Sequence, residues 1–134
     1  MKNVKSENYP LKGSDDIVAV RQMLRKIMQE IGFSIVDQTK MVTAASELAR
    51  NVVAHGGGGS VTFNVVENDG HLGVQAIFED SGPGIPDVEL ALQDGYTTGN
   101  GLGLGLGGAK RLVHEFSIHS EVGKGTRVEI LRWR

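Results

Sequence analysis

Two polar side chains on one predicted helix are the first candidates for chemistry in this sequence. Glu47 and Asn51 lie four positions apart in the segment SELARN, and this spacing places both on one face of a helix. His55 follows four positions later. Such a face is often merely solvated, but the apolar Leu48 and Val52 indicate a largely buried helix. Buried polar groups need a partner, so we expect a ligand, an ion or water beside this face.

A second candidate is the carboxylate that begins the turn-rich segment DSGPGIP, residues 80–86. Asp80 ends a β-rich run, and a carboxylate at a strand end can accept a hydrogen bond from a base amino group. Gly82 and Gly84 would let a flat ring approach the backbone, while the prolines stiffen the turn. The alternative interpretation is an ordinary surface turn.

The third candidate is the glycine-rich run GNGLGLGLGG, residues 99–108, which leads directly into a predicted helix. Bare N–H groups ahead of a helix N-terminus attract anions, and phosphate is the natural ligand. A flexible loop without a ligand would expose the interleaved leucines without purpose. No predicted strand precedes the run, which argues against a dinucleotide fingerprint, and Lys110 is followed by Arg111 rather than Ser or Thr, which excludes a Walker A motif.

Hydrophobic periodicity predicts the elements that position these candidates. Helical spacing runs from Ser14, a plausible N-cap, to Gly32 and again from Val36 to Ala54. Residues 2–12 could form an edge strand that ends near Pro10. The remaining expected elements are a hairpin of strands 61–67 and 72–79 around Asn68-Asp69-Gly70, a short helix 88–92, a helix 108–115, and strands 116–121 and 127–133.

This order of elements predicts an α+β fold. Strands that arrive mostly as hairpins, with segregated helices, favour a two-layer α/β sandwich: a mixed, mostly antiparallel sheet covered by helices on one face. The length of 134 residues and 40% hydrophobic content are typical of one domain, 1–134.

Composition excludes several classes of function. The absence of cysteine rules out disulfides, zinc-thiolate sites and thiol nucleophiles. The formal charge of −2, without long runs of one sign, indicates neither a nucleic-acid nor a membrane-surface partner. Because the N-terminus has no apolar signal region and no long apolar run follows, we expect a cytoplasmic protein.

Together these motifs resemble the nucleotide-binding boxes of the GHKL superfamily, which has the Bergerat fold. Glu47 with Asn51 is similar to the N box, residues 80–84 to the G1 box, residues 101–107 to the G2 lid and residues 123–126 to the last G box. All four occur in the family order. Within the superfamily, the small size and the stretches around SELARN and DGYTTGNGLGLGL resemble the anti-sigma-factor-type serine/threonine kinases, especially the switch kinases of the stressosome.

The resemblance implies ATP and Mg²⁺ as cofactors and a role for each motif. Asn51 would ligate the metal, and Glu47 would take the proton from the hydroxyl that is phosphorylated. Asp80 would accept from the adenine amino group, with Gly84 beneath the ring and Thr126 in support. The other nucleotide contacts that it implies come from Gly82, from Gly101, Gly103, Gly105 and Gly107 around the β- and γ-phosphates, and from His55 and Lys110.

The resemblance also implies partners. A kinase of this type phosphorylates Ser or Thr of a STAS-domain protein and, when released, activates a PP2C-type phosphatase. One alternative is a nucleotide-gated binding module that captures a sigma factor, phosphatase or antagonist; the presence of Glu47 favours the kinase. Another is a detached catalytic domain that phosphorylates histidine. The oligomeric state stays open.

Overall fold

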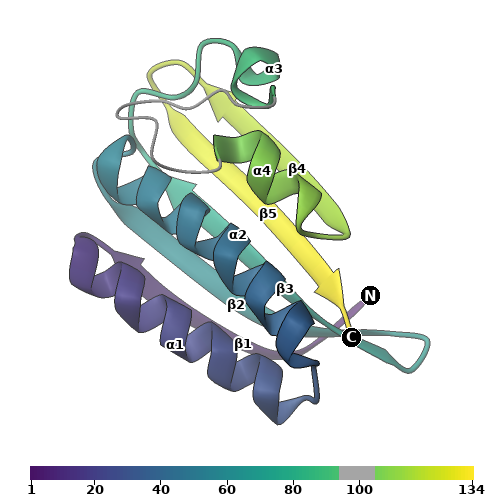
Figure 1. Ribbon diagram of the computed structural model, residues 1–134. Helices are drawn as coiled ribbons and strands as arrows, with labels where there is room; N and C mark the ends of the chain where they lie inside the picture. Colours follow the sequence, from purple (N-terminus) through teal and green to yellow (C-terminus); the bar gives the residue numbers. More distant parts are fainter. Residues whose placement is uncertain (94–104) are drawn as a thin grey trace.

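The computed structural model describes residues 1–93 and 105–134 of the chain (Figure 1). The predicted lid residues Gly101 and Gly103 lie outside the described residues. The elements, in chain order, are β1 (Lys2–Leu11), α1 (Ser14–Glu30), α2 (Ile35–Ala54), β2 (Gly59–Asn68), β3 (His71–Asp80), α3 (Val88–Ala91), α4 (Gly105–Arg111), β4 (Glu115–Glu121) and β5 (Gly125–Trp133).

The five strands form one sheet in the order β1-β2-β3-β5-β4. The sheet was predicted to be mixed and mostly antiparallel, and all four pairings among these strands are antiparallel. Figure 1 shows α1, α2 and α4 on one face of this sheet. The predicted two-layer α+β fold is therefore confirmed, with β1 as the expected edge strand.

The β2–β3 hairpin closes as its sequence predicts. Asn68 pairs with His71, which leaves Asp69 and Gly70 as a two-residue loop. Both loop residues have positive φ, 52° and 81°. This conformation suits the right-handed twist of the flanking strands, and Asp-Gly adopts it at little cost. The register of the hairpin places Asp80 opposite Gly59, at the end of the sheet.

The two long helices begin at capped positions, one of which differs from the prediction. Gly13, not Ser14, is the N-cap of α1. The Asp16 carboxylate accepts hydrogen bonds from the backbone N–H groups of Lys12 (2.7 Å) and Gly13 (3.4 Å), so it satisfies donors that a Ser14 cap would not reach. At α2, the Ser34 hydroxyl accepts from the N–H of Asp37 at 3.1 Å.

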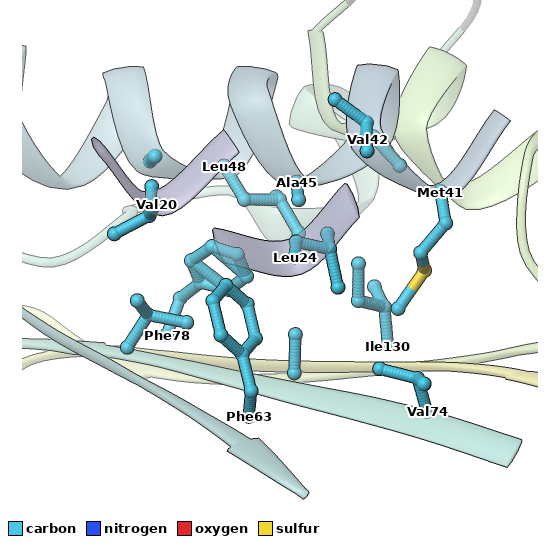
Figure 2. Packing of buried hydrophobic residues seen from close by; sticks show 14 of the residues in the cluster. Val20, Leu24, Met41, Val42, Ala45, Leu48, Phe63, Val74, Phe78 and Ile130 are labelled. Atoms are coloured by element: carbon cyan, nitrogen blue, oxygen red, sulfur yellow. The ribbon is translucent and has the colours of Figure 1, made fainter. Parts of the chain in front are cut away.

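The core lies between the helices and the inward face of the sheet (Figure 2). Helix α2 contributes Met41, Ala45 and Leu48, which are at most 1% exposed. Phe63 and Phe78 meet them from the sheet. Because α2 lies between α1 and α4 and packs on the strands below, polar residues on its α4 side are held in fixed positions.

Helix α4 corrects the predicted boundaries of 108–115. It begins at Gly105 and ends at Arg111, so Gly105 and Gly107 belong to its first turn rather than to a preceding loop. A side chain at Gly107 would overlap the carbonyl oxygen of Leu92, so only glycine fits where the chain passes α3. The helix ends early because the N–H of His114 already donates to the Leu131 carbonyl of β5 (2.9 Å).

Candidate functional site

Glu47 is a buried carboxylate on the side of α2 that faces α4. The residue is only 7% exposed. Its Oε2 accepts a hydrogen bond from Nη1 of Arg50 at 2.8 Å, and its Oε1 accepts from the backbone N–H of Gly105 at 3.1 Å. A carboxylate has about four acceptor positions, so each oxygen keeps capacity for a further hydrogen bond. The two donors therefore fix the orientation of this buried carboxylate and leave it able to contact a further partner.

Asn51 and His55 occupy the last turn of α2 and its cap. The Asn51 carbonyl accepts from the N–H groups of His55 (2.9 Å) and Gly56 (3.1 Å), which ends the helix. The Asn51 side chain is half-buried and has no hydrogen bond to another described residue. Its amide oxygen is the hard ligand that Mg²⁺ prefers. His55 is exposed at the C-cap position, beyond the buried face.

Asp80 stands at the end of β3 with Gly59 of β2 on one side and Thr126 of β5 on the other. Its Oδ1 accepts from the N–H of Gly82 at 3.0 Å, which fixes the turn. No other hydrogen bond joins this carboxylate to a described residue, so Oδ2 remains an available acceptor. The role of Asp80 as an acceptor for a base amino group stays a prediction.

The glycines of the 80–84 turn have a structural role that the sequence did not reveal. Gly82 lies against Gly56, whose carbonyl oxygen is 2.6 Å from the point that a Cβ would occupy. Gly84 has φ of +77°, and a Cβ there would overlap the Glu121 carbonyl. The N–H of Gly123 also donates to the Pro83 carbonyl at 2.8 Å. Close contact between backbones thus requires these glycines, whatever ligand they also contact.

A hydroxyl network at the start of β5 was missed by sequence reasoning. The Ser120 Oγ is 2.8 Å from the Thr126 Oγ1 and accepts from the N–H of Ile85 at 2.8 Å. On β4 the inward positions are Phe116, Ile118 and Ser120. A serine at an inward position, after two apolar residues with period two, was the available signal.

The remaining predicted nucleotide contacts lie on α4. Gly105 and Gly107 form its first turn, and Lys110 is exposed in its last turn. Lys110 lies five residues after Gly105, which is about one and a half turns along α4. The structure does not bring Lys110 to the described residues of the other motifs, and its role stays a prediction.

A hollow of about 460 Å³ opens at the end of the sheet near Asp80 and Thr126. Its other charged lining includes Glu79 and Arg127, which form an ion pair of 3.0 Å. Phe78 and Val128 point into the core, so the adjacent Glu79 and Arg127 point to the opposite face. The hollow therefore lies mostly on the face away from α2 and differs from the site of Glu47 and Asn51.

Two features are absent from the described part of the chain. In residues 1–93 and 105–134, no helix has the length and apolar character to span a membrane. The same residues contain no group of three or more His, Cys, Asp or Glu side chains that could hold a metal ion. A metal site of one amide oxygen, as predicted for Asn51, does not depend on such a group.

The chain is similar to proteins of known class. The family model for histidine kinase-, DNA gyrase B-, and HSP90-like ATPases matches residues 36–134. The serine/threonine-protein kinase RsbT of Bacillus subtilis (strain 168) is 47% identical over 118 residues, which cover 88% of this chain and 89% of RsbT. The anti-sigma F factor of Geobacillus stearothermophilus is 37% identical over 99 residues, 67% of this chain and 65% of that factor.

Two solved structures share the fold. The RsbU and RsbW domains of Rv1364c from Mycobacterium tuberculosis superpose with a TM-score of 0.67 at 25% identity, over 98% of this chain and 33% of that chain. The mycobacterial sensor histidine kinase MprB gives a TM-score of 0.57 at 17% identity, over 96% and 97% of the two chains.

Proposed function

Because the chain belongs to the family of histidine kinase-, DNA gyrase B-, and HSP90-like ATPases, we propose that it transfers the γ-phosphate of ATP to a serine or threonine of a STAS-domain regulator. The predicted family and the serine/threonine kinase class are confirmed by the family match and by 47% identity to RsbT. ATP binding follows from the family. The STAS substrate, the Mg²⁺ requirement and a cytoplasmic location are parts of the proposal.

The observation that carries the proposal is the hydrogen bond between Oε1 of Glu47 and the N–H of Gly105. It brings the buried carboxylate of α2 to the end of the glycine-rich segment, where the sequence predicts phosphate binding. A base has to lie near the phosphate that is transferred, because proton removal and phosphoryl transfer concern the same hydroxyl. Mere nucleotide binding would not need a carboxylate there.

The other predicted site residues would position the metal, the phosphates and the base. Asn51 would hold Mg²⁺, which supplies charge neutralisation at the phosphates, and Gly101, Gly103, Gly105 and Gly107 would direct N–H groups to them. Asp80 would accept from the adenine amino group, assisted by Thr126. Phosphoryl transfer depends mainly on positioning and electrostatic stabilisation, so this small set of groups is sufficient.

The proposal also covers organisation and partners. We propose a single domain over residues 1–134, because the five strands share one sheet and the helices one core. Regulatory partners are supported by the similarity to an anti-sigma F factor and to the RsbU and RsbW domains. Activation of a PP2C-type phosphatase after release from the STAS protein is the finer form of this proposal.

A second function is a binding module gated by nucleotide. The similarity to anti-sigma F factors favours it, since those relatives are named as factors that oppose a sigma factor. In that case ATP would shape the surface, and a sigma factor or phosphatase would be captured stoichiometrically. Transfer to the partner would then be absent even though ATP binds.

The test is transfer of labelled γ-phosphate, with Mg²⁺, to STAS-domain proteins encoded near the gene. Glu47→Gln and Asn51→Asp are the informative variants, and Glu30→Gln, at the exposed end of α1, is the matched control. Acid-stable label on a STAS protein, lost in the first two variants and kept in the control, supports the kinase. Acid-labile label would indicate histidine phosphorylation, and ATP binding without transfer would indicate the binding module.

A further inference from the structure

Ser120 joins three separate segments at the end of the sheet. It lies on β4 directly opposite Thr126 of β5, and the two hydroxyl oxygens are 2.8 Å apart. The N–H of Ile85, in the turn after Asp80, donates to the Ser120 Oγ at 2.8 Å. The Gly125 carbonyl is a further acceptor for the serine proton, at 3.2 Å. One small side chain therefore connects β4, β5 and the 80–86 turn.

Counting protons limits what this network can do. A serine hydroxyl has one proton and two acceptor positions, and Ile85 occupies one of the acceptors. The serine proton can go to Thr126 or to Gly125. The 2.8 Å contact with Thr126 can be donated from either side, so two arrangements are possible. In one, Ser120 donates to the Gly125 carbonyl and accepts from Thr126; in the other, Ser120 donates to Thr126. When Ser120 donates to Thr126, the threonine proton is free to point elsewhere.

In the arrangement in which Ser120 donates to Thr126, the free threonine proton would lie beside the Asp80 carboxylate. Thr126 is the cross-strand partner of Asp80. Both lie two positions from a core residue, Phe78 or Val128, and side chains two positions apart share one face of a sheet, so both occupy the inward face. A hydroxyl donor next to a carboxylate acceptor matches the edge of an adenine ring, where the amino group donates and the neighbouring N1 accepts. If the Thr126 hydroxyl pointed its proton away from the base, the adenine edge would meet two acceptors, the hydroxyl oxygen and the Asp80 carboxylate. The adenine N1 would then have no donor.

We propose that Ser120 is a positioning residue for base recognition, because it orients the Thr126 hydroxyl as a donor toward the N1 edge of adenine beside Asp80. This inference rests on the proposed function, in which Asp80 accepts from the adenine amino group. Ser120 itself does not contact the base. By holding the N–H of Ile85 it also fixes the turn that follows Asp80.

The experiment compares two nucleotides in the wild type and Ser120→Ala by calorimetry with Mg²⁺. One is ATP, and the other is 1-deazaadenosine triphosphate, which keeps the amino group but replaces ring N1 by C–H. We expect Ser120→Ala to weaken ATP binding about three- to tenfold, the effect of one neutral hydrogen bond. Binding of the deaza nucleotide should change less than twofold, since it lacks the N1 acceptor.

Control variants separate positioning from general damage. Ser117→Ala removes an exposed, outward serine of the same strand and should leave both affinities unchanged. Ser120→Thr keeps the hydroxyl and should restore discrimination between the nucleotides, which also covers the case in which Ser120→Ala folds poorly. Equal weakening of both nucleotides by Ser120→Ala, or no restoration by threonine, would overturn the inference. A wild type that binds no ATP would instead overturn the proposed function.

Discussion

Glu47 and Gly105 are 58 positions apart in the sequence, and a hydrogen bond of 3.1 Å joins the Glu47 carboxylate to the Gly105 backbone N–H. Neither α2 nor α4 can shift without changing this contact. The same carboxylate forms an ion pair with Arg50 at 2.8 Å, but that side chain is 54% exposed and the pair is screened by solvent. The contact with α4 is therefore what fixes the proposed base relative to the glycine-rich segment.

Replacing Glu47 by Gln tests its role with little disturbance of the fold. The glutamine Oε1 can still accept from the Gly105 N–H, but an amide cannot take a proton. We expect the rate of phosphate transfer to fall at least about a hundredfold, with ATP affinity changed less than about threefold. Transfer kinetics and calorimetry measure the two quantities. Equal losses in both would show that Glu47 serves binding rather than proton transfer.

Asp80→Asn tests recognition of the base. The asparagine Oδ1 can keep the hydrogen bond from the Gly82 N–H, while an NH₂ donor replaces the free Oδ2 acceptor. We expect ATP affinity to fall about tenfold or more, because two donors would meet at the amino group. The affinity for inosine triphosphate, whose 6-oxo group accepts a hydrogen bond, should fall much less in this variant.

Asp69→Asn in the β2–β3 loop is the matched control, since asparagine tolerates the positive φ of 52° there. It should bind ATP as the wild type does. If Asp80→Asn binds ATP as tightly as this control, Asp80 does not recognise the amino group.

Gly84→Ala tests the close packing of the turn on the β4–β5 hairpin. Both Gly84 and Gly57 have positive φ, 77° and 74°, but a Cβ at Gly84 would overlap Glu121 whereas Gly57 has open space. Gly57→Ala therefore measures the backbone strain alone, and Gly84→Ala measures strain and overlap together. We expect Gly84→Ala to lose more than about 1 kcal/mol of unfolding free energy and to lose more than Gly57→Ala. Urea denaturation measures both, and equal losses would contradict the packing argument.

The ion pair between Asp37 and Arg132 predicts a pH-dependent contribution to stability. The hydrogen bond from Arg132, at 2.6 Å, holds the pKa of Asp37 below its ordinary value, with burial opposing it. A lowered folded-state pKa stabilises the fold above the unfolded pKa of about 3.9, and this contribution is lost as the pH falls through the folded pKa.

Asp37→Asn should therefore cost about 1 kcal/mol near neutral pH, because a charged hydrogen bond to Arg132, which is 11% exposed, becomes a neutral one. The difference in unfolding free energy between this variant and the wild type should shrink below about pH 4. Asp15→Asn, in the exposed first turn of α1, controls for the helix dipole. A wild-type difference that is constant from pH 7 to pH 3 would refute the assignment.

Much of the fold was predictable because its signals are local. The Asp69-Gly70 turn fixed the register of β2 against β3, and apolar spacing located α1 and α2 within two residues of their observed starts and ends. The start of α4 was predicted three residues late, since glycine disfavours helix in isolation and only packing against Leu92 and Glu47 places Gly105 and Gly107 in its first turn.

Some features of the candidate site were likewise predictable from local sequence, and others were not. Residue types and spacing by themselves determined Glu47 and Asn51 on one helix face, Asp80 at a strand end and the order of the glycine-rich segments. Only the tertiary structure decided that Gly105 meets Glu47, that Gly84 lies against Glu121 and that Ser120 joins Thr126 to Ile85. The physical reason is that the periodicity of a helix or strand depends on residues close together in the sequence. A hydrogen bond between distant segments depends instead on how the whole core packs.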